Sequence, residues 1–360
     1  MRTCNLVCQS VATVLVALLQ VACCIGSAQA QAYRAILLTP APVGNSYALG
    51  ADGGLVVGFV DTVNAQLPMV WSATTGAIVK DLSTPAHPSG IAFGISGSKI
   101  VGDTAGYGQA YSGVVWDANT GAVTPLSAKG MNSVYALGIH GNAICGVGEW
   151  SLSRFNAGAD ALLWATAIGP VSDLNPSSGD YIDTEAIATD GKQTVGFGYS
   201  LLNYYEPYGL LWNGTSTNPV VLCPGYDSVN GVANGEQVGQ VGNDGVIWHG
   251  TAASKISLTP TGYYGSSAMG TNGQQEVGWA GLDYSPVFDG PLYQHAMVWS
   301  GSSKRFVDLQ QFLPSQFVSS VAYAIDSNGN VVGAASKDNF YYQAVLWRVH
   351  GPTAGGGGGL

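Results

Sequence analysis

A tryptophan preceded by apolar residues recurs along the chain at an average interval of 46 residues. Upstream of each copy lie an apolar-Gly pair and, four or five residues before its Gly, a turn Gly, as in Asp52-Gly53 followed by Val57-Gly58. The seven copies are Trp71, Trp116, Trp164, Trp212, Trp248, Trp299 and Trp347. Self-similarity at such a period indicates a repeat architecture in which each unit packs on its neighbours.

Each repeat has the pattern of four short strands. The turn Gly supplies the positive φ of a tight hairpin between the first and second strands. The Gly of the apolar-Gly pair ends the second strand, where it lets a neighbouring backbone approach closely. The Trp ends the third strand, and its fixed register predicts a core position between sheets. The fourth strands are expected at Ile78–Leu82, Val123–Leu126, Val171–Leu174, Val220–Cys223, Ile256–Leu258 and Phe306–Leu309. We therefore predict an all-β protein, a seven-bladed β-propeller with four-stranded blades.

The chain termini predict how the ring closes. The seventh repeat has strands around Tyr323–Ile325, Val331–Gly333 and Ala344–Trp347 but no convincing fourth strand. Near the N-terminus, Ala35–Pro40 parallels Lys255–Pro260, the fourth-strand segment of the fifth repeat. We expect this N-terminal strand to complete the last blade, so that no unfinished blade exposes an edge.

Residues 1–30 are typical of a secretory signal peptide. Arg2 supplies the positive charge, Val11–Cys24 is mostly apolar, and Ala28-Gln29-Ala30 is a small-x-small cleavage site. The apolar run is too short for a comfortable membrane span, and no other stretch approaches the required length. We predict a secreted protein, periplasmic or extracellular, with a propeller at 31–350 and a flexible Gly-rich tail at 351–360. A lipoprotein anchored at Cys23 or Cys24 is the alternative, although neither has a proper lipobox.

Two of the six cysteines, Cys145 and Cys223, remain after cleavage. Their spacing fits no metal motif. Because they lie in the strand patterns of different repeats, we predict two small buried thiols. A disulfide is the alternative in an oxidising compartment.

Charge is sparse and negative. Charged residues make up 9% of the chain, and the formal net charge is −10. This charge repels phosphate backbones and anionic lipid surfaces. We therefore exclude nucleic acid and membrane headgroups as partners, and we expect a monomer.

The repeat unit reads as Ala-x-x-Ile, a turn, Val-Gly, a variable loop, a His-Ala-Phe-like strand, Leu-Trp and Asp-Leu. Ala322–Gly333 matches the first half of this repeat unit best. His295–Trp299 with Asp308-Leu309 matches its second half well. This pattern resembles the HAF repeats, an extracellular repeat family of bacteria, over nearly all of 33–350. The resemblance implies a propeller-like repeat fold and brings no catalytic residue. Only His295 among the seven units carries the His of the family's name, which argues against a shared His chemistry.

The loops of such a blade alternate between two faces. The turns from strand one to two and from three to four lie on one face and are short. The loops from strand two to three and the links between blades lie on the other face and vary in length. Gly239 to Trp248 is nine residues, whereas Gly278 to Trp299 is twenty-one. Variable loops on a rigid scaffold usually carry binding, so we place ligand recognition on this variable face.

The long loops are rich in aromatic residues. Tyr and Trp offer flat apolar faces with a polar handle, which suits stacking on a sugar ring or packing on a protein. The ligand-binding candidates are Trp150, Arg154, Tyr199, Tyr204, Tyr205, Glu206, Asp283, Tyr284, His295 and Tyr341. The alternative is that these rings fill gaps between loops and blades.

No catalytic constellation is evident. The chain lacks a Gly-x-Ser-x-Gly nucleophile motif, and its five histidines are not in metal spacing, so we predict no metal and no cofactor. Glu206, Asp283 and Asp289 are the best acid–base candidates and could converge near the channel mouth. Surface acids are, however, usually just solvated.

Three functions fit these features. The leading hypothesis is a secreted binding or scaffold propeller for a glycan or protein ligand at the variable face. The second is a secreted hydrolase or lyase that acts on polysaccharide through Tyr and acidic loop residues, which rests on analogy with other propellers. The third is a structural protein of the cell envelope.

Overall fold

The structure is a computed structural model that describes residues 32–39, 44–106, 110–150, 158–176, 181–200, 206–225, 227–285 and 290–350, without the side chains of 284–292. The signal peptide and the Gly-rich tail predicted above lie outside these residues. The compact unit Tyr33–Val349 contains the fold. No helix in the described part of the chain is long and apolar enough to span a bilayer.

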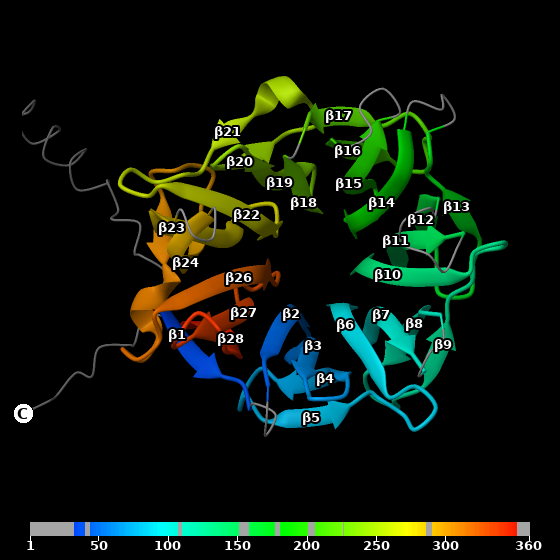
Figure 1. The fold of residues 1–360 in the computed structure, drawn as a ribbon, viewed down its shortest axis with the longest axis horizontal. Coiled ribbons are helices and arrows are strands. Elements are labelled where there is room, and N and C mark those ends of the chain that lie inside the picture. The colour runs from blue at the N-terminus through cyan, green and yellow to red at the C-terminus, as the bar shows by residue number, and fades with distance from the viewer. Residues whose placement is uncertain are drawn as a thin grey trace, which may run out of the picture. The chain divides into compact units, whose positions relative to one another are not determined.

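The described strands form seven four-stranded antiparallel sheets, arranged as the blades of a propeller (Figure 1). The first strands of the blades surround the centre of the ring. They are β2 (Ser46–Asp52), β6 (Ser89–Ser96), β10 (Ser133–His140), β14 (Tyr181–Thr189), β18 (Ser228–Ala233), β22 (Gly265–Thr271) and β26 (Ser319–Ile325). The second strands are β3 (Leu55–Asp61), β7 (Lys99–Ala105), β11 (Ala143–Glu149), β15 (Gln193–Ser200), β19 (Glu236–Val241), β23 (Glu276–Ser285) and β27 (Val331–Ser336). The predicted fold is confirmed.

The third and fourth strands complete each blade towards the rim. The third strands are β4 (Gln66–Ser72), β8 (Ser112–Asp117), β12 (Ala159–Trp164), β16 (Pro207–Asn213), β20 (Asp244–Trp248), β24 (Gly290–Trp299) and β28 (Tyr342–His350). The fourth strands are β5 (Ile78–Asp81), β9 (Val123–Pro125), β13 (Val171–Asp173), β17 (Val220–Cys223), β21 (Ile256–Ser257), β25 (Phe306–Asp308) and β1 (Ala32–Leu37). Two short 3₁₀ helices, η1 (Ala252–Ser254) and η2 (Leu309–Phe312), lie in the connections. Blade 1 is β2–β5, and blades 2 to 7 follow in chain order.

The N-terminal strand closes the ring as predicted. The sheet of blade 7 has the order β1-β28-β27-β26, so the start and the end of the propeller pair in one blade. The strand begins and ends three residues earlier than expected, at Ala32–Leu37. The chain crosses to blade 1 directly afterwards, because Leu38 N still donates to Ala344 O at 2.9 Å whereas Thr39 N donates to Gly76 O at 2.8 Å. We call the interface between blades 7 and 1 the closing seam.

The repeat tryptophans occupy the core between blades, with at most 2% of each side chain exposed. Trp71 of blade 1, for example, shares a cluster with Val332, Ala344 and Leu346 of blade 7. Its indole Nε1–H donates to Thr39 O at 3.1 Å, just after the fourth strand of blade 7. Trp164, Trp212 and Trp347 donate to the corresponding carbonyls of Ser127, Leu174 and Leu309. In these four blades the indole thus links the blade to the end of the previous one.

The strand-ending glycines allow the close backbone approach that the sequence predicts. A Cβ atom on Gly58 would lie 1.9 Å from Tyr47 O on the first strand of the same blade. The same 1.9 Å contact recurs at Gly102, Gly146, Gly196, Gly239, Gly278 and Gly333. Any side chain at this position would therefore push the first strand away.

The two remaining cysteines are buried and free, as predicted. Burial raises the pKa of the Cys145 thiol well above its usual range and raises the pKa of Cys223 to about 12. Both therefore stay as neutral thiols and act as small core side chains.

Candidate functional site

The hairpin of blade 6 corrects one expectation about the variable face. The sequence predicted an irregular loop after Gly278, but β23 and β24 continue as a paired hairpin out to Ser285 and Gly290. Asp283 pairs with Leu292 and Tyr284 with Pro291, so both belong to regular strands. Extended pairing satisfies the backbone N–H and C=O groups of this long segment, which an irregular loop would leave to water.

Several predicted candidates cannot be placed. Arg154, Tyr204, Tyr205 and Asp289 lie outside the described residues, as does the side chain of Tyr284. The others belong to blades 3, 4, 6 and 7 and are described one by one below.

Trp150 of blade 3 is held at the end of β11 with 47% of its surface exposed. Its Nε1–H donates to Asp160 Oδ2 at 2.8 Å, and Asn175 Nδ2 donates to Asp160 Oδ1 at 2.7 Å. Burial raises the pKa of Asp160. The ring also covers Gly130, where a Cβ would lie 2.9 Å from Trp150 Cζ3. Half of this indole therefore packs on its own blade and the other half faces outwards.

Tyr199 and Glu206 lie on either side of the variable loop of blade 4. Tyr199 is half-buried in β15 and contacts Phe197 edge-on, with the ring centroids 5.8 Å apart. Glu206 is half-buried directly before β16. Asp283 is exposed in the hairpin of blade 6, so Glu206 and Asp283 belong to blades that are separated by the whole of blade 5.

His295 fastens the third strand of blade 6 to the fourth. Its Nδ1 lies 2.8 Å from Asp308 Oδ2, and Tyr263 Oη donates to the same oxygen at 3.3 Å. Burial and the Asp308 charge raise the pKa of Tyr263 to about 12. Asp308 Oδ1 accepts from Gln310 N at 2.9 Å and so caps η2. These contacts give His295 a role in joining the two strands.

Tyr341 lines a cavity of about 200 Å³ on the variable face of the closing seam. We call it the Tyr341 cavity. Its walls come from both sides of the seam and consist of Gly44, Phe317, Lys337, Asp338, Tyr341, Tyr342 and Gln343. One of its lining residues, Tyr341, is a ligand-binding candidate predicted from the sequence.

A turn built on Asp338 carries two exposed aromatic residues, Phe340 and Tyr341, of which Tyr341 lines the cavity. Asp338 Oδ1 accepts from the backbone N–H groups of Phe340 and Tyr341, both at 2.9 Å. These hydrogen bonds lower the pKa of the Asp338 carboxyl. Asn339, between Asp338 and Phe340, takes the left-handed conformation with φ 64°. The turn leaves Phe340 72% and Tyr341 69% exposed, side by side in sequence.

The base of the turn rests on a chain of stacked rings. Tyr342 stacks on Tyr47 with centroids 5.9 Å apart, and Tyr47 stacks on Phe59 at 4.9 Å. Burial raises the pKa of Tyr47. Tyr342 N also donates to Asn45 Oδ1 at 2.8 Å across the seam. The base of the turn therefore contacts both blades.

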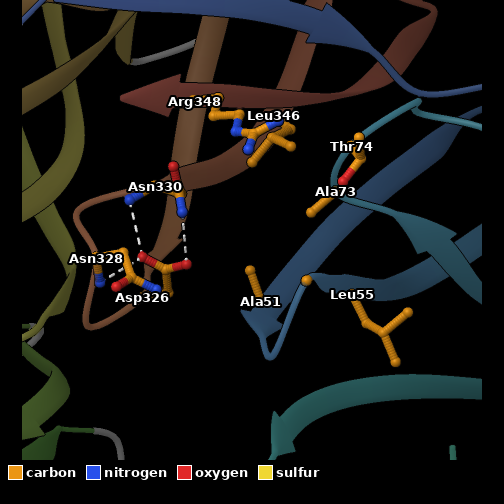
Figure 2. A pocket seen from close by; sticks show the side chains of 10 residues that line it. Ala51, Leu55, Ala73, Thr74, Asp326, Asn328, Asn330, Leu346 and Arg348 are labelled. Carbon is orange, nitrogen blue, oxygen red and sulfur yellow. Dashed lines mark hydrogen bonds between the residues drawn. The ribbon is translucent and has the colours of Figure 1, made fainter. Parts of the chain in front are cut away.

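A second cavity of about 170 Å³ lies on the short-turn face of the same seam (Figure 2). Its polar side is the turn of Asp326, whose carboxylate accepts from Asn328 N, Asn330 N and Asn330 Nδ2, each at 2.8 Å. Arg348 lines it and forms no ion pair with any described residue. Asp326 and Arg348 both belong to blade 7, and ring closure adds the opposite wall from blade 1, which includes Ala51 and Thr74.

Neither cavity supplies a metal centre. The described residues contain no group of three or more His, Cys, Asp or Glu side chains placed to hold a metal ion. The Tyr341 cavity offers aromatic faces, the charges of Lys337 and Asp338, and the neutral amide of Gln343.

Comparison with known proteins supports the fold. The sequence matches no protein-family model and no curated protein. Among solved structures, the β-propeller domain of the Trilobed protease from Pyrococcus furiosus is 11% identical with a TM-score of 0.55, over 84% of this chain and 95% of that one. An oligogalacturonate lyase from Vibrio parahaemolyticus is 12% identical with a TM-score of 0.53, over 88% of this chain and 93% of that one. A puromycin hydrolase is 11% identical with a TM-score of 0.56, over 87% of this chain and 56% of that one. At these identities the likeness concerns the fold alone: the chain is a seven-bladed β-propeller.

Proposed function

We propose that this protein is an exported binding propeller that recognises a neutral carbohydrate at the Tyr341 cavity. The observation that carries the proposal is the exposed ring of Tyr341 in the wall of that cavity, with the exposed Phe340 next to it in the same turn. Aromatic rings displayed in this way pack against the apolar face of a sugar, while the phenol hydroxyl bonds its polar edge.

The size and chemistry of the cavity fit one sugar ring. At about 200 Å³ it is smaller than the roughly 300–1,000 Å³ of pockets for drug-sized ligands. Gln343 Nε2 donates to Leu38 O at 3.0 Å, which leaves its carbonyl oxygen to accept from a ligand hydroxyl. The net charge of −10 disfavours polyanionic ligands. A longer chain of sugars would extend over Phe340.

Export and family membership belong to the same proposal. The signal-peptide pattern of residues 1–30 supports secretion to the periplasm or the medium. The repeat pattern, best seen in Ala322–Gly333, supports membership of the HAF-repeat family. Amino-terminal sequencing of the exported protein tests the first point, and we expect the mature chain to begin at Gln31.

Binding is favoured over polysaccharide cleavage by the placement of the acids. Glu206 and Asp283 stand on blades 4 and 6, whereas a carboxylate pair that cleaves a glycosidic bond must flank a single bond. Incubation of the protein with each bound oligosaccharide should release no new reducing ends or unsaturated products. Release that is lost in Glu206→Gln or Asp283→Asn would instead support the hydrolase or lyase hypothesis.

The test of binding uses the mature protein on a panel of neutral oligosaccharides, followed by titration calorimetry. We expect Tyr341→Ala and Phe340→Ala each to weaken binding about three- to tenfold, and the double variant to abolish it. Ile168→Ala is the control, because Ile168 is 89% exposed in the turn between β12 and β13, on the opposite face. Absence of binding across the panel, or binding that the double variant leaves unchanged, would overturn the proposal.

A further inference from the structure

One core position differs in chemistry around the ring. It lies two residues before the strand-ending Gly and is fully or almost fully buried in every blade. Blades 1, 2, 3 and 7 carry the apolar residues Val56, Ile100, Ile144 and Val331. Blades 4, 5 and 6 carry the polar residues Thr194, Gln237 and Glu276, which are 1%, 0% and 0% exposed. A buried carboxyl costs far more than a buried hydroxyl or amide, so Glu276 requires compensation.

The first two polar residues are satisfied by neutral partners. Thr194 Oγ1 donates to Thr189 Oγ1 at 3.1 Å. Gln237 Nε2 donates to Gln193 Oε1 at 2.8 Å, and Gln237 Oε1 accepts from Gly250 N at 2.7 Å. For Glu276, Oε2 accepts from Gly301 N at 2.9 Å, but Oε1 has no partner among the described residues.

The group beside Glu276 is a second acid, Glu236 of blade 5, which is 8% exposed. Glu276 is the cross-strand neighbour of Thr271 in the ladder between β22 and β23 of blade 6. Thr271 Oγ1 of blade 6 donates to Glu236 Oε1 at 2.5 Å and holds it there. Two ionised carboxylates buried side by side repel each other and can only accept hydrogen bonds, so the pair is stable only with a proton on one of them.

We propose that Glu236 and Glu276 share one proton in the folded protein and act as a pH-sensitive lock between blades 5 and 6. Burial, with a contribution from Glu236, raises the pKa of Glu276 from 4.5 to about 7. From the strands around it, β22 presents Thr271 and β24 presents Trp299, neither of which is charged. No described basic side chain forms an ion pair with either acid.

The direction of the effect follows from proton binding. The folded protein keeps the proton up to about pH 7, whereas the unfolded chain releases it near 4.5. The contribution of this pair to the free energy of unfolding is therefore greatest below pH 4.5. It declines as the pH rises to 7 and is constant above pH 7. The gap of more than two pH units predicts that the folding equilibrium constant falls by about a hundredfold across this range. This lock is independent of the proposed carbohydrate site, which lies at the closing seam.

The test combines infrared spectroscopy with unfolding. The infrared comparison uses an Asp103→Asn background, because burial raises the pKa of Asp103 to about 7 and this carboxyl also keeps its proton at pH 6. In that background we expect the carbonyl band of a protonated carboxylic acid at pH 6, and a weaker band when Glu276→Gln is added. In urea unfolding from pH 4 to 9, the folding equilibrium constant of the wild type should fall between pH 4.5 and 7. In Glu276→Gln this fall should be smaller by a factor of about one hundred, because a neutral amide cannot lose a proton. Glu276→Val, which installs the residue of blades 1 and 7, should remove the same pH dependence.

Two outcomes would overturn the proposal. One is the absence of a protonated-acid band at pH 6 once Asp103→Asn is introduced, which is measurable even if a Glu276 variant fails to fold. The other is stabilisation of the wild type by added Ca²⁺ that Glu276→Gln abolishes, since the pair would then hold a cation instead of a proton.

Discussion

Ser46 Oγ accepts a hydrogen bond of 3.0 Å from the backbone N–H of Ala344, a residue 298 positions further along the chain. The same link joins other neighbouring blades. Thr184 accepts from Ala161 N at 3.0 Å, Ser266 from Gly245 N at 2.9 Å, and Ser320 from Ala296 N at 2.9 Å. In each case a hydroxyl on the first strand of one blade bonds the third strand of the previous blade. At the closing seam this bond ties the two ends of the propeller together.

Ser46→Ala should destabilise the propeller by about 1–3 kcal/mol, because it leaves the buried Ala344 N–H without a partner. Ser327→Ala, which alters an exposed turn, should change stability by less than about 0.5 kcal/mol. Urea unfolding of both variants measures the difference. Equal stability of the two would show that the hydroxyl does not hold the seam.

Gly58→Ala should be among the most damaging single changes, since its Cβ would lie 1.9 Å from Tyr47 O. The first strand has to shift, so we expect a loss of about 3 kcal/mol or more. Gly54→Ala is the control: Gly54 has φ +82° and no atom within 4 Å of the added Cβ, so it should lose only about 1–2 kcal/mol. A reversed order in chemical denaturation would contradict the close-approach role.

Trp71→Phe should cost about 1 kcal/mol more than Trp299→Phe. Both rings are fully buried, so the loss of volume is similar in the two variants. Trp71 Nε1–H donates to Thr39 O, however, whereas the indole N–H of Trp299 has no partner among the described residues. Removing a satisfied donor also leaves the carbonyl unpaired. Thermal and urea unfolding of the two variants should separate them, and identical losses would exclude a contribution from the Trp71 hydrogen bond.

Asp103 of blade 2 provides an independent pH dependence. It is 4% exposed, and burial raises its pKa from 3.8 to about 7, although Ile91 N donates to its Oδ1 at 3.2 Å. Because the folded pKa lies above the unfolded one, this carboxyl makes stability decline between about pH 4 and pH 7. Asp103→Asn should flatten that part of the profile in urea unfolding.

The effects of Asp103→Asn and Glu276→Gln should add, because blade 2 shares no seam with blades 5 and 6. A double variant in which the two effects are strongly non-additive would contradict separate sites.

The repeat signals explain how much of the fold the sequence predicts. Each signal is local: a Trp in the core, a Gly under a neighbouring strand and a turn Gly lie within one unit, and the segment before Thr39 repeats an element seen elsewhere. The links between blades are not local. Ser46 and Ala344, or Glu236 and Glu276, become neighbours only after the ring is built, and nothing in their own flanking sequence marks them.

In the candidate site, too, some features are marked by local sequence and others arise only from contacts between distant segments. Tyr341 stood out in sequence as an aromatic residue in a variable loop, and the structure places it at a cavity. His295 stood out too, but its imidazole bonds Asp308 within its own blade. Gly44 completes the Tyr341 cavity from the link before β2, at the other end of the chain, so its contribution depends on ring closure.

Hydrogen–deuterium exchange tests most directly the claim that the closing seam carries the binding site. The mature protein would be compared with and without the oligosaccharide that binds most tightly in the neutral panel. We predict slower exchange in residues 337–343, around the Asp338 turn, and no change at Asp326–Asn330 on the opposite face. Protection confined to the opposite face, or spread over other blades with none at 337–343, would contradict the account.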